Sequence, residues 1–249
     1  ALFALLAIDR IVVERELGLA AAGRYQVAFL IGGAGLSILA AVNNAWSPIV
    51  LDGPVDGRWQ RLALSTAELE RLVPVVVGAI ALASPIAMKI AVPAAYDPTA
   101  LTRIAMIVAA STVPYLWYLA GAHVLFAERC TGALVRITPL VAVANVVTTI
   151  ILVRTFGLAG AALATVGSYA MLALLIRRHA RSLARPPWNR AATRRCVALS
   201  AVAVAAALLL PVDGIGWIGA RLVLLVLAGL AAISGRSAAP VGRPAMVGG

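Results

Sequence analysis

The sequence predicts an all-α protein, a polytopic transmembrane helix bundle of about eight spans. Hydrophobic residues make up 62% of the 249 residues and charged residues only 12%, whereas a soluble domain is about half apolar and a quarter charged. This excess of apolar residues is more than one globular core can bury, so we expect lipid to solvate the rest. The apolar runs are uniform and longer than the ~10 alternating residues of a barrel strand, which favours helices.

Eight runs approach the ~20 apolar residues that a helix needs to cross a membrane. Residues 1–176 hold six of them, at about 1–13, 23–50, 72–92, 103–126, 134–153 and 158–176. A basic linker at 177–195 leads to an additional hairpin at 196–235, with helices at about 196–210 and 218–234. The tail at 236–249 is rich in Gly, Pro, Ala and Val, and is predicted to be disordered. Because the first run is shorter than a full span, we expect the chain to be part of a longer protein.

Basic residues are distributed unevenly between alternate loops. Fourteen of the 21 Lys and Arg residues lie in the loops at 51–71, 128–136 and 177–195 and in the tail, and six lie in the alternate loops. The positive-inside rule therefore places the first set in the cytoplasm and the turns near Gly18 and Tyr96 outside it. Segment 177–195 holds seven Arg and no acid, and we interpret it as a cytoplasmic determinant of topology that contacts lipid headgroups.

The sequence contains no motif of an enzyme or of a cofactor site. It has no Gly-rich phosphate loop ending in Lys-Ser/Thr, two Cys without metal-ligand spacing, and two His without a partner at helical spacing. We therefore predict neither catalytic residues nor a metal or cofactor. The positive charge lies in loops between apolar spans, which favours membrane topology over nucleic-acid binding.

Two similar segments occur at predicted extracytoplasmic turns. Leu17-Gly18-Leu19-Ala20 and Phe156-Gly157-Leu158-Ala159 each lead into a predicted helix, and a tyrosine follows each of them, Tyr25 and Tyr169. Glycine permits a tight turn and a close approach between helices. We interpret the two segments as a repeated packing device.

Polar residues within spans are costly and tend to face the interior of a bundle or a cavity. The candidate cavity or substrate residues are Asp9, Arg10, Asn43, Asn44, Tyr115, Tyr118 and His123. Asp9 and Arg10 are predicted to form a cavity ion pair that binds an anionic headgroup or couples to a cation, or else a solvated pair at a helix end. The asparagines could equally form hydrogen bonds between helices, and the aromatic residues could stack on sugar rings or pack the bundle. Asn145, in the middle of a span, is predicted to contact a neighbouring helix.

Several short motifs together are similar to those of one transporter family. Asp9-Arg10, Leu17-Gly18, Ala22-Gly23-Arg24-Tyr25 and Ala45-Trp46-Ser47-Pro48 resemble the seventh and eighth helices of polysaccharide-type (Wzx-like) flippases of the MOP exporter superfamily. The polar segment 51–71 resembles the connector of that family, and Ala94-Ala95-Tyr96 its short outer loop. The most specific resemblance is that of segment 154–162, Arg-Thr-Phe-Gly-Leu-Ala-Gly-Ala-Ala, to the family's turn between helices 11 and 12.

The resemblance covers about residues 1–235 and implies the C-terminal lobe, helices 7 to 14, of a two-lobed transporter. It implies flipping of an undecaprenyl-diphosphate-linked oligosaccharide across the bacterial inner (cytoplasmic) membrane for surface polysaccharide such as O-antigen lipopolysaccharide. The implied partners are that lipid-linked oligosaccharide, membrane lipids, a coupling cation (H⁺ or Na⁺) and the N-terminal lobe. The chain departs from the family in one respect, because its first cavity helix holds few basic residues to meet a diphosphate.

Three other functions stay open from the sequence. A multidrug/cation antiporter or a lipid II flippase would belong to the same superfamily. A non-transport membrane protein of polysaccharide assembly is the third, although the sequence has no long extracytoplasmic loop with clustered polar residues and no pair of acids.

Overall fold

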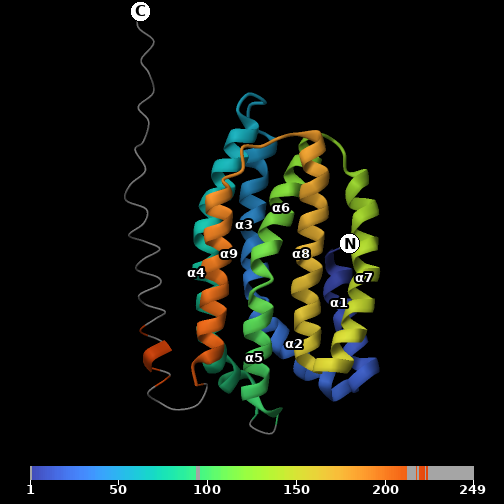
Figure 1. Cartoon of the computed structure of the whole chain (residues 1–249), viewed down its shortest axis with the longest axis vertical. Coiled ribbons are helices and arrows are strands. Elements are labelled where there is room, and N and C mark those ends of the chain that lie inside the picture. Colours follow the sequence, from blue (N-terminus) through green and yellow to red (C-terminus); the bar gives the residue numbers. More distant parts are fainter. Residues whose placement is uncertain (1, 94–95, 212–216, 218, 222, 224–249) are drawn as a thin grey trace, which may run out of the picture.

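A computed structural model describes residues 2–93, 96–211, 217, 219–221 and 223. In this part of the chain the helices stand roughly parallel in a single bundle (Figure 1). They are α1 (Leu2–Leu17), α2 (Leu19–Gly32), α3 (Ala34–Leu51), α4 (Arg58–Ala91), α5 (Pro98–Ala109), α6 (Thr112–Ala127), α7 (Gly132–Phe156), α8 (Leu158–Leu183) and α9 (Arg190–Leu209).

Six helical segments among the described residues have the length and apolar composition to cross a membrane. They comprise α3, α4, the pair α5–α6, α7, α8 and α9. The prediction of a helical membrane bundle is therefore confirmed, while the predicted total of eight spans stays a prediction. Helices α1 and α2 have 16 and 14 residues, fewer than the ~20 of a full span. Most of the predicted eighth span, 218–234, and the tail at 236–249 lie outside the described residues.

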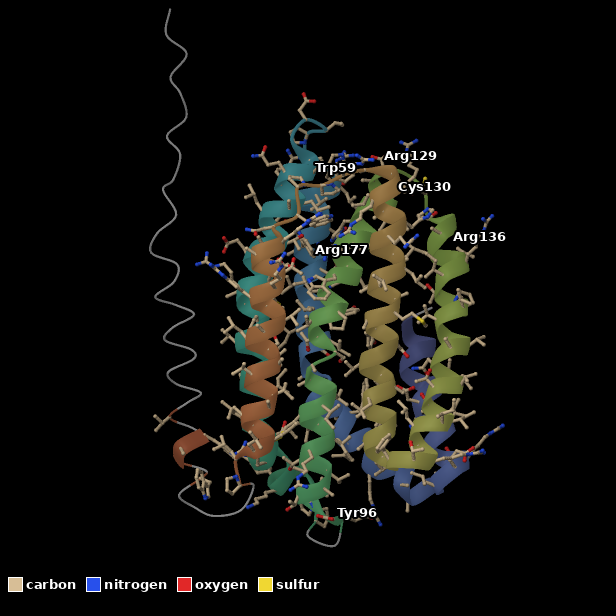
Figure 2. The ribbon with its side chains drawn as sticks, in the orientation of Figure 1. Trp59, Tyr96, Arg129, Cys130, Arg136 and Arg177 are labelled. Carbon is tan, nitrogen blue, oxygen red and sulfur yellow. The ribbon has the colours of Figure 1, made fainter. Side chains whose placement is uncertain are left out.

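Where the structure describes them, the loops of the two predicted sets lie at opposite ends of the bundle. The connections α3–α4, α6–α7 and α8–α9 share one end, near which Figure 2 labels Trp59, Arg129, Cys130 and Arg136. The α4–α5 loop with Tyr96 lies at the other end, together with the α1–α2 and α7–α8 turns. We call these the Arg-rich end and the Tyr96 end. This arrangement is the one that the predicted topology requires.

The polar segment 51–71, predicted as a loop, is helical from Arg58 onward. It forms the first part of α4, whose 34 residues span about 51 Å at 1.5 Å per residue, well beyond a hydrocarbon core of about 30 Å. The buried positions Leu62, Thr66, Glu70 and Val73 follow helical spacing. One face of this segment is therefore packed although its composition is polar.

The basic linker predicted at 177–195 is also shorter than expected. Helix α8 continues to Leu183 and α9 begins at Arg190, so only residues 184–189 are non-helical. Pro186 and Pro187 interrupt the helix because proline lacks the backbone donor. Asn189 caps α9 by accepting hydrogen bonds of 3.0 Å from the backbone N–H groups of residues 191 and 192.

Two predicted spans are each divided into two helices. The second span becomes α2 and α3, which meet at Gly33, and the fourth becomes α5 and α6, which meet at residues 110–111. Helices α2 and α5 approach closely near these breaks. A Cβ atom at Gly32 would lie 2.3 Å from the carbonyl oxygen of Ala105, so only glycine fits at this contact.

Candidate functional site

The site is built on the two glycine corners that the sequence repeats. Gly18 (φ +89°) joins α1 to α2, and Gly157 (φ +59°) joins α7 to α8. Positive φ favours glycine, which has no Cβ to clash with the backbone. Both corners lie at the Tyr96 end of the bundle (Figure 1), and α1 packs against both α2 and α7. The prediction of tight glycine turns is confirmed at both positions.

Four polar side chains lie seven to nine residues from these corners: Asp9, Tyr25, Thr149 and Thr165. At 1.5 Å per residue this distance is about 10–14 Å along each helix. Since both corners lie at the same end, the four side chains come to one level inside the bundle. We call them the Asp9 cluster.

Hydrogen bonds connect all members of the Asp9 cluster. The Thr149 hydroxyl on α7 donates to Asp9 Oδ1 at 3.2 Å, and the Thr165 hydroxyl on α8 donates to Asp9 Oδ2 at 2.5 Å. The Tyr25 hydroxyl on α2 lies 3.0 Å from Thr165 Oγ1. All four side chains are at most 3% exposed. One carboxylate thus receives hydroxyl groups from two helices, and its network reaches a third.

A second polar pair lies one helical turn farther from the corners. Asn145 Nδ2 on α7 donates to Ser168 Oγ on α8 at 2.7 Å, as expected for an amide that contacts a neighbouring helix. Asn145 Oδ1 is buried and accepts no hydrogen bond within the described part of the chain. It is therefore an oxygen atom without a partner, one turn from Thr149.

The charge of Asp9 has no cationic partner among the described ion pairs. A buried, uncompensated carboxylate is costly in a low-dielectric environment, so such a group is protonated or meets a cation. The described residues hold no cluster of three or more His, Cys, Asp and Glu. A single carboxylate surrounded by hydroxyl and amide oxygens is a donor set that suits a proton or a hard monovalent cation.

The Thr165 hydroxyl can adapt to either state of Asp9. It has one proton to donate, and besides Asp9 it lies 3.1 Å from the carbonyl oxygen of Ala161. If Thr165 donates to Ala161, its oxygen lone pairs turn toward Asp9, where they can bind a cation. The same hydroxyl can therefore stabilise the carboxylate or contribute an oxygen ligand.

An ion pair connects the same helices at the Tyr96 end. Arg154 on α7 donates from Nε and Nη2 to the two carboxylate oxygens of Glu16 on α1, at 2.8 and 2.9 Å. This two-point geometry fixes orientation. It places α1 against α7 next to both corners and helps to set the register of the Asp9 cluster.

The structure separates Asp9 from Arg10, which were predicted to form an ion pair. Asp9 is 1% exposed, whereas Arg10 is exposed. Successive residues of an α-helix do not face each other, so the two side chains meet different surroundings. The pair therefore does not form, and only Asp9 belongs to the cluster.

The predicted aromatic residues of α6 are packed in the core. The Tyr115 ring stacks on Tyr118 at 5.9 Å between centroids and meets Tyr169 of α8 edge-on at 5.5 Å. The His123 ring lies 4.6 Å from Trp46, and within the described residues both of its nitrogens lack a hydrogen-bond partner.

The predicted asparagines Asn43 and Asn44 lie on α3 near the Arg-rich end. Asn43 is half-buried and Asn44 is exposed. The structure does not bring either the α6 aromatic residues or these asparagines to the Asp9 cluster.

Sequence reasoning did not identify Tyr25, Thr149, Thr165 and Ser168 as site residues. Single hydroxyl residues are frequent in membrane helices and carry little signal alone. What could have identified them is their similar distance in sequence from the two corner glycines, which is seen when the segments around Gly18 and Gly157 are compared.

Protein-family models, curated proteins and solved structures give no match to this chain. The fold and the site therefore define the class of protein on their own: a multi-pass α-helical membrane protein with a carboxylate buried between four helices.

Proposed function

We propose that this chain is one lobe of a cation-coupled flippase in the bacterial cytoplasmic membrane. Its substrate is an undecaprenyl-diphosphate-linked oligosaccharide, which it moves toward the outer leaflet together with an N-terminal lobe. Na⁺ or H⁺ binds at Asp9 and couples the ion gradient to the movement of the two lobes.

The observation that carries this proposal is the buried carboxylate of Asp9 with its hydroxyl partners on α7 and α8. Burying an ionisable group inside a membrane bundle costs free energy, so such groups are rare. Those that occur mark ion pathways and proton relays. Helix packing alone needs no charge, since the neighbouring Asn145–Ser168 pair connects α7 and α8 through neutral groups. A carboxylate at this level is therefore best explained by a cation that it binds and releases.

The cluster is also placed where a change of state can move helices. Asp9 lies on α1, and its partners lie on α7, α8 and, through Tyr25, on α2. Loss of the cation leaves a bare buried charge, which favours a rearrangement that admits water. A rearrangement of these helices changes the surface that this lobe presents to the other lobe, and movement of one lobe against the other is what alternating access requires.

The substrate class is tested by reconstitution into liposomes that contain a fluorescent lipid-linked oligosaccharide. We expect the chain together with its N-terminal lobe to move this lipid between leaflets, and residues 1–249 alone to be inactive, because a midplane site needs both lobes. If the reconstituted protein transports a small amphiphilic cation and not the lipid, the function is that of a multidrug/cation antiporter and the flippase proposal is wrong. Flipping by residues 1–249 alone would overturn the half-transporter assignment.

A further inference from the structure

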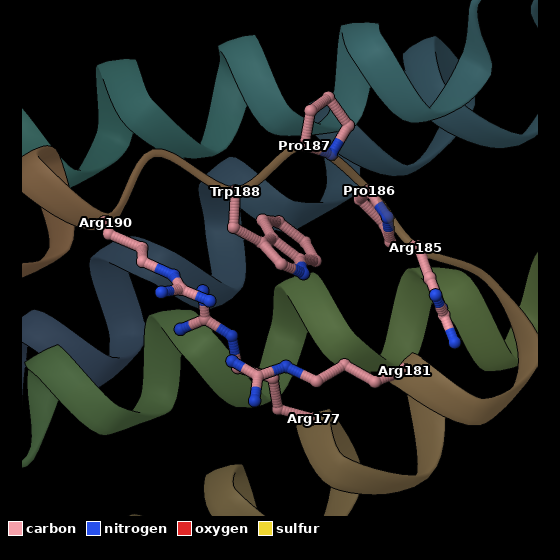
Figure 3. A pocket seen from close by; sticks show the side chains of 7 residues that line it. All are labelled: Arg177, Arg181, Arg185, Pro186, Pro187, Trp188 and Arg190. Atoms are coloured by element: carbon pink, nitrogen blue, oxygen red, sulfur yellow. The ribbon is translucent and has the colours of Figure 1, made fainter.

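A second feature, unrelated to the Asp9 cluster, lies at the Arg-rich end where α8 connects to α9. A pocket of about 520 Å³ opens between the end of α8 and the linker 184–189 (Figure 3). Its lining residues are Arg177, Arg181, Arg185, Pro186, Pro187, Trp188 and Arg190. Four of these seven residues are arginines and none is an acid.

Three guanidinium groups share this pocket. Figure 3 shows Arg177, Arg181 and Arg190 pointing toward one another beside the Trp188 indole, while Arg185 points away. Within the described residues none of these arginines forms an ion pair with an acid. Like charges at close range repel, so this arrangement favours the binding of an anion.

Arg177 is held in place before any ligand arrives. Its guanidinium lies 4.9 Å from the centre of the Trp188 ring and 5.9 Å from that of Trp117, within the range of cation–π attraction. Trp117 is itself fixed, because its indole N–H donates to Glu70 at 2.9 Å. Arg177 Nε is buried and has no hydrogen-bond partner among the described residues.

Glu70 is the nearby acid whose charge acts on Arg177. Its Oε1 atom already accepts hydrogen bonds from Trp117 and, at 2.8 Å, from the Thr193 hydroxyl. One carboxylate beside three converging guanidinium groups leaves a local excess of positive charge. Arginine forms paired hydrogen bonds with phosphate oxygens. A phosphate group would therefore neutralise the excess positive charge and accept hydrogen bonds from the guanidinium groups.

The position of the pocket along the bundle favours a lipid as the source of the phosphate. Arg177 lies below the loops of the Arg-rich end, toward the middle of the bundle (Figure 2). Arg177 directly follows the apolar run that ends at Ile176, so we infer that it lies where the hydrocarbon core meets the lipid headgroups. If that end is cytoplasmic, these headgroups belong to the cytoplasmic leaflet. Basic pockets between helices on the cytoplasmic side are suited to doubly charged lipid headgroups. We propose that the pocket binds the phosphate groups of a cardiolipin-type anionic lipid from the cytoplasmic leaflet; this does not depend on the transport function.

The test uses native mass spectrometry of the full chain in detergent, titrated with cardiolipin and, separately, with phosphatidylcholine. The wild type should retain cardiolipin and not phosphatidylcholine. Arg181→Gln combined with Arg190→Gln should weaken cardiolipin binding at least about tenfold, because charge-assisted hydrogen bonds to phosphate are lost. Both side chains are exposed, so the variant should fold. Arg177→Gln is the second variant, and its melting temperature shows whether a loss reflects misfolding.

Arg178→Gln combined with Arg195→Gln is the matched control. It removes the same charge from exposed positions of α8 and α9 that do not line the pocket, and it should bind within about twofold of the wild type, since an exposed charge outside the pocket contributes little. Equal weakening of both double variants would mean that binding follows net charge, and no weakening of either would leave the pocket without a role; each result overturns the proposal. If inorganic diphosphate displaces cardiolipin at equal concentration, the ligand is a soluble anion and the lipid assignment is wrong.

Discussion

Thr165 donates a hydrogen bond of 2.5 Å to Asp9, although 156 positions separate the two residues in the sequence. This contact joins the first described helix to α8 and places a hydroxyl against a carboxylate that is 1% exposed. The charge of Asp9 is thereby surrounded by neutral donors. The glycine corners at Gly18 and Gly157 bring the two residues to this contact.

Na⁺ should stabilise the wild-type chain through Asp9. Carboxylate, hydroxyl and amide oxygens at the cluster supply ligands to the cation, and a ligand that binds only the folded state raises its stability. In detergent at constant ionic strength, replacing choline chloride with NaCl at about ten times the dissociation constant should raise the melting temperature by on the order of 2–5 °C if Na⁺ is the coupling cation. No shift would leave H⁺ as the cation. Differential scanning fluorimetry measures this shift.

Asp9→Asn should abolish the shift, because the neutral amide keeps the shape of the carboxylate and removes its charge. Arg10→Gln is the matched control, since Arg10 is adjacent but exposed, and it should retain the shift. Equal Na⁺ responses of Asp9→Asn and the wild type would rule out Na⁺ binding at Asp9.

The hydroxyl groups should contribute separately from the carboxylate. Thr149→Val and Thr165→Val remove an oxygen ligand while preserving shape, and each should weaken the apparent Na⁺ affinity about tenfold. Thr165→Ser should restore the affinity because it returns the hydroxyl. Thr138→Val, on the same helix as Thr149 and also buried, should have no effect; isothermal titration of Na⁺ compares the four. Unchanged affinity in both valine variants at the cluster would show that the threonines only pack the helices.

The sequence was sufficient to predict the membrane helices and the end of the bundle at which each connecting loop lies. A long apolar run in lipid must satisfy its backbone hydrogen bonds internally, which a helix does. It was insufficient for the first part of α4. Residues 58–71 are rich in charge, yet Leu62, Thr66 and Glu70 face the bundle. Composition does not reveal burial when a helix extends beyond the apolar region and packs through one face.

The candidate site was predicted only in part for a similar reason. Asp9 was identified because a charge within a span is rare, whereas its partners are ordinary threonines. Thr149 and Thr165 lie 140 and 156 positions from Asp9, so their contact depends on how α1, α7 and α8 pack. The predicted ion pair between Asp9 and Arg10 was wrong because successive residues of a helix point in different directions.

The α7–α8 corner should not tolerate a side chain at Gly160. A Cβ atom there would lie 1.9 Å from the Leu152 carbonyl oxygen, so Gly160→Ala should push the helices apart and destabilise the fold by on the order of 1–3 kcal/mol. Gly167→Ala, on the same helix with no atom within 4 Å of its Cβ position, should be neutral or stabilising by up to ~1 kcal/mol. Melting in detergent compares them, and equal stability of both variants would contradict the close approach.

The topology predicts which positions face outward. With Cys130 and Cys196 replaced by serine, Leu19→Cys and Tyr96→Cys should react with a membrane-impermeant maleimide added to intact cells. Leu19 begins α2 at the α1–α2 turn of the Tyr96 end, and both residues are exposed. Arg190→Cys, at the opposite end, should react only after permeabilisation. Labelling of Arg190→Cys in intact cells would reverse the orientation, and with it the leaflet assigned to the arginine pocket.

The most direct test of the proposed function is whether an ion gradient drives lipid flipping through Asp9. In proteoliposomes holding both lobes and a fluorescent lipid-linked oligosaccharide, an imposed Na⁺ or H⁺ gradient should accelerate flipping by the wild type and by Arg10→Gln. Asp9→Asn, present at equal abundance, should lose this acceleration. Gradient-driven flipping by Asp9→Asn at the wild-type rate would contradict coupling through the buried carboxylate.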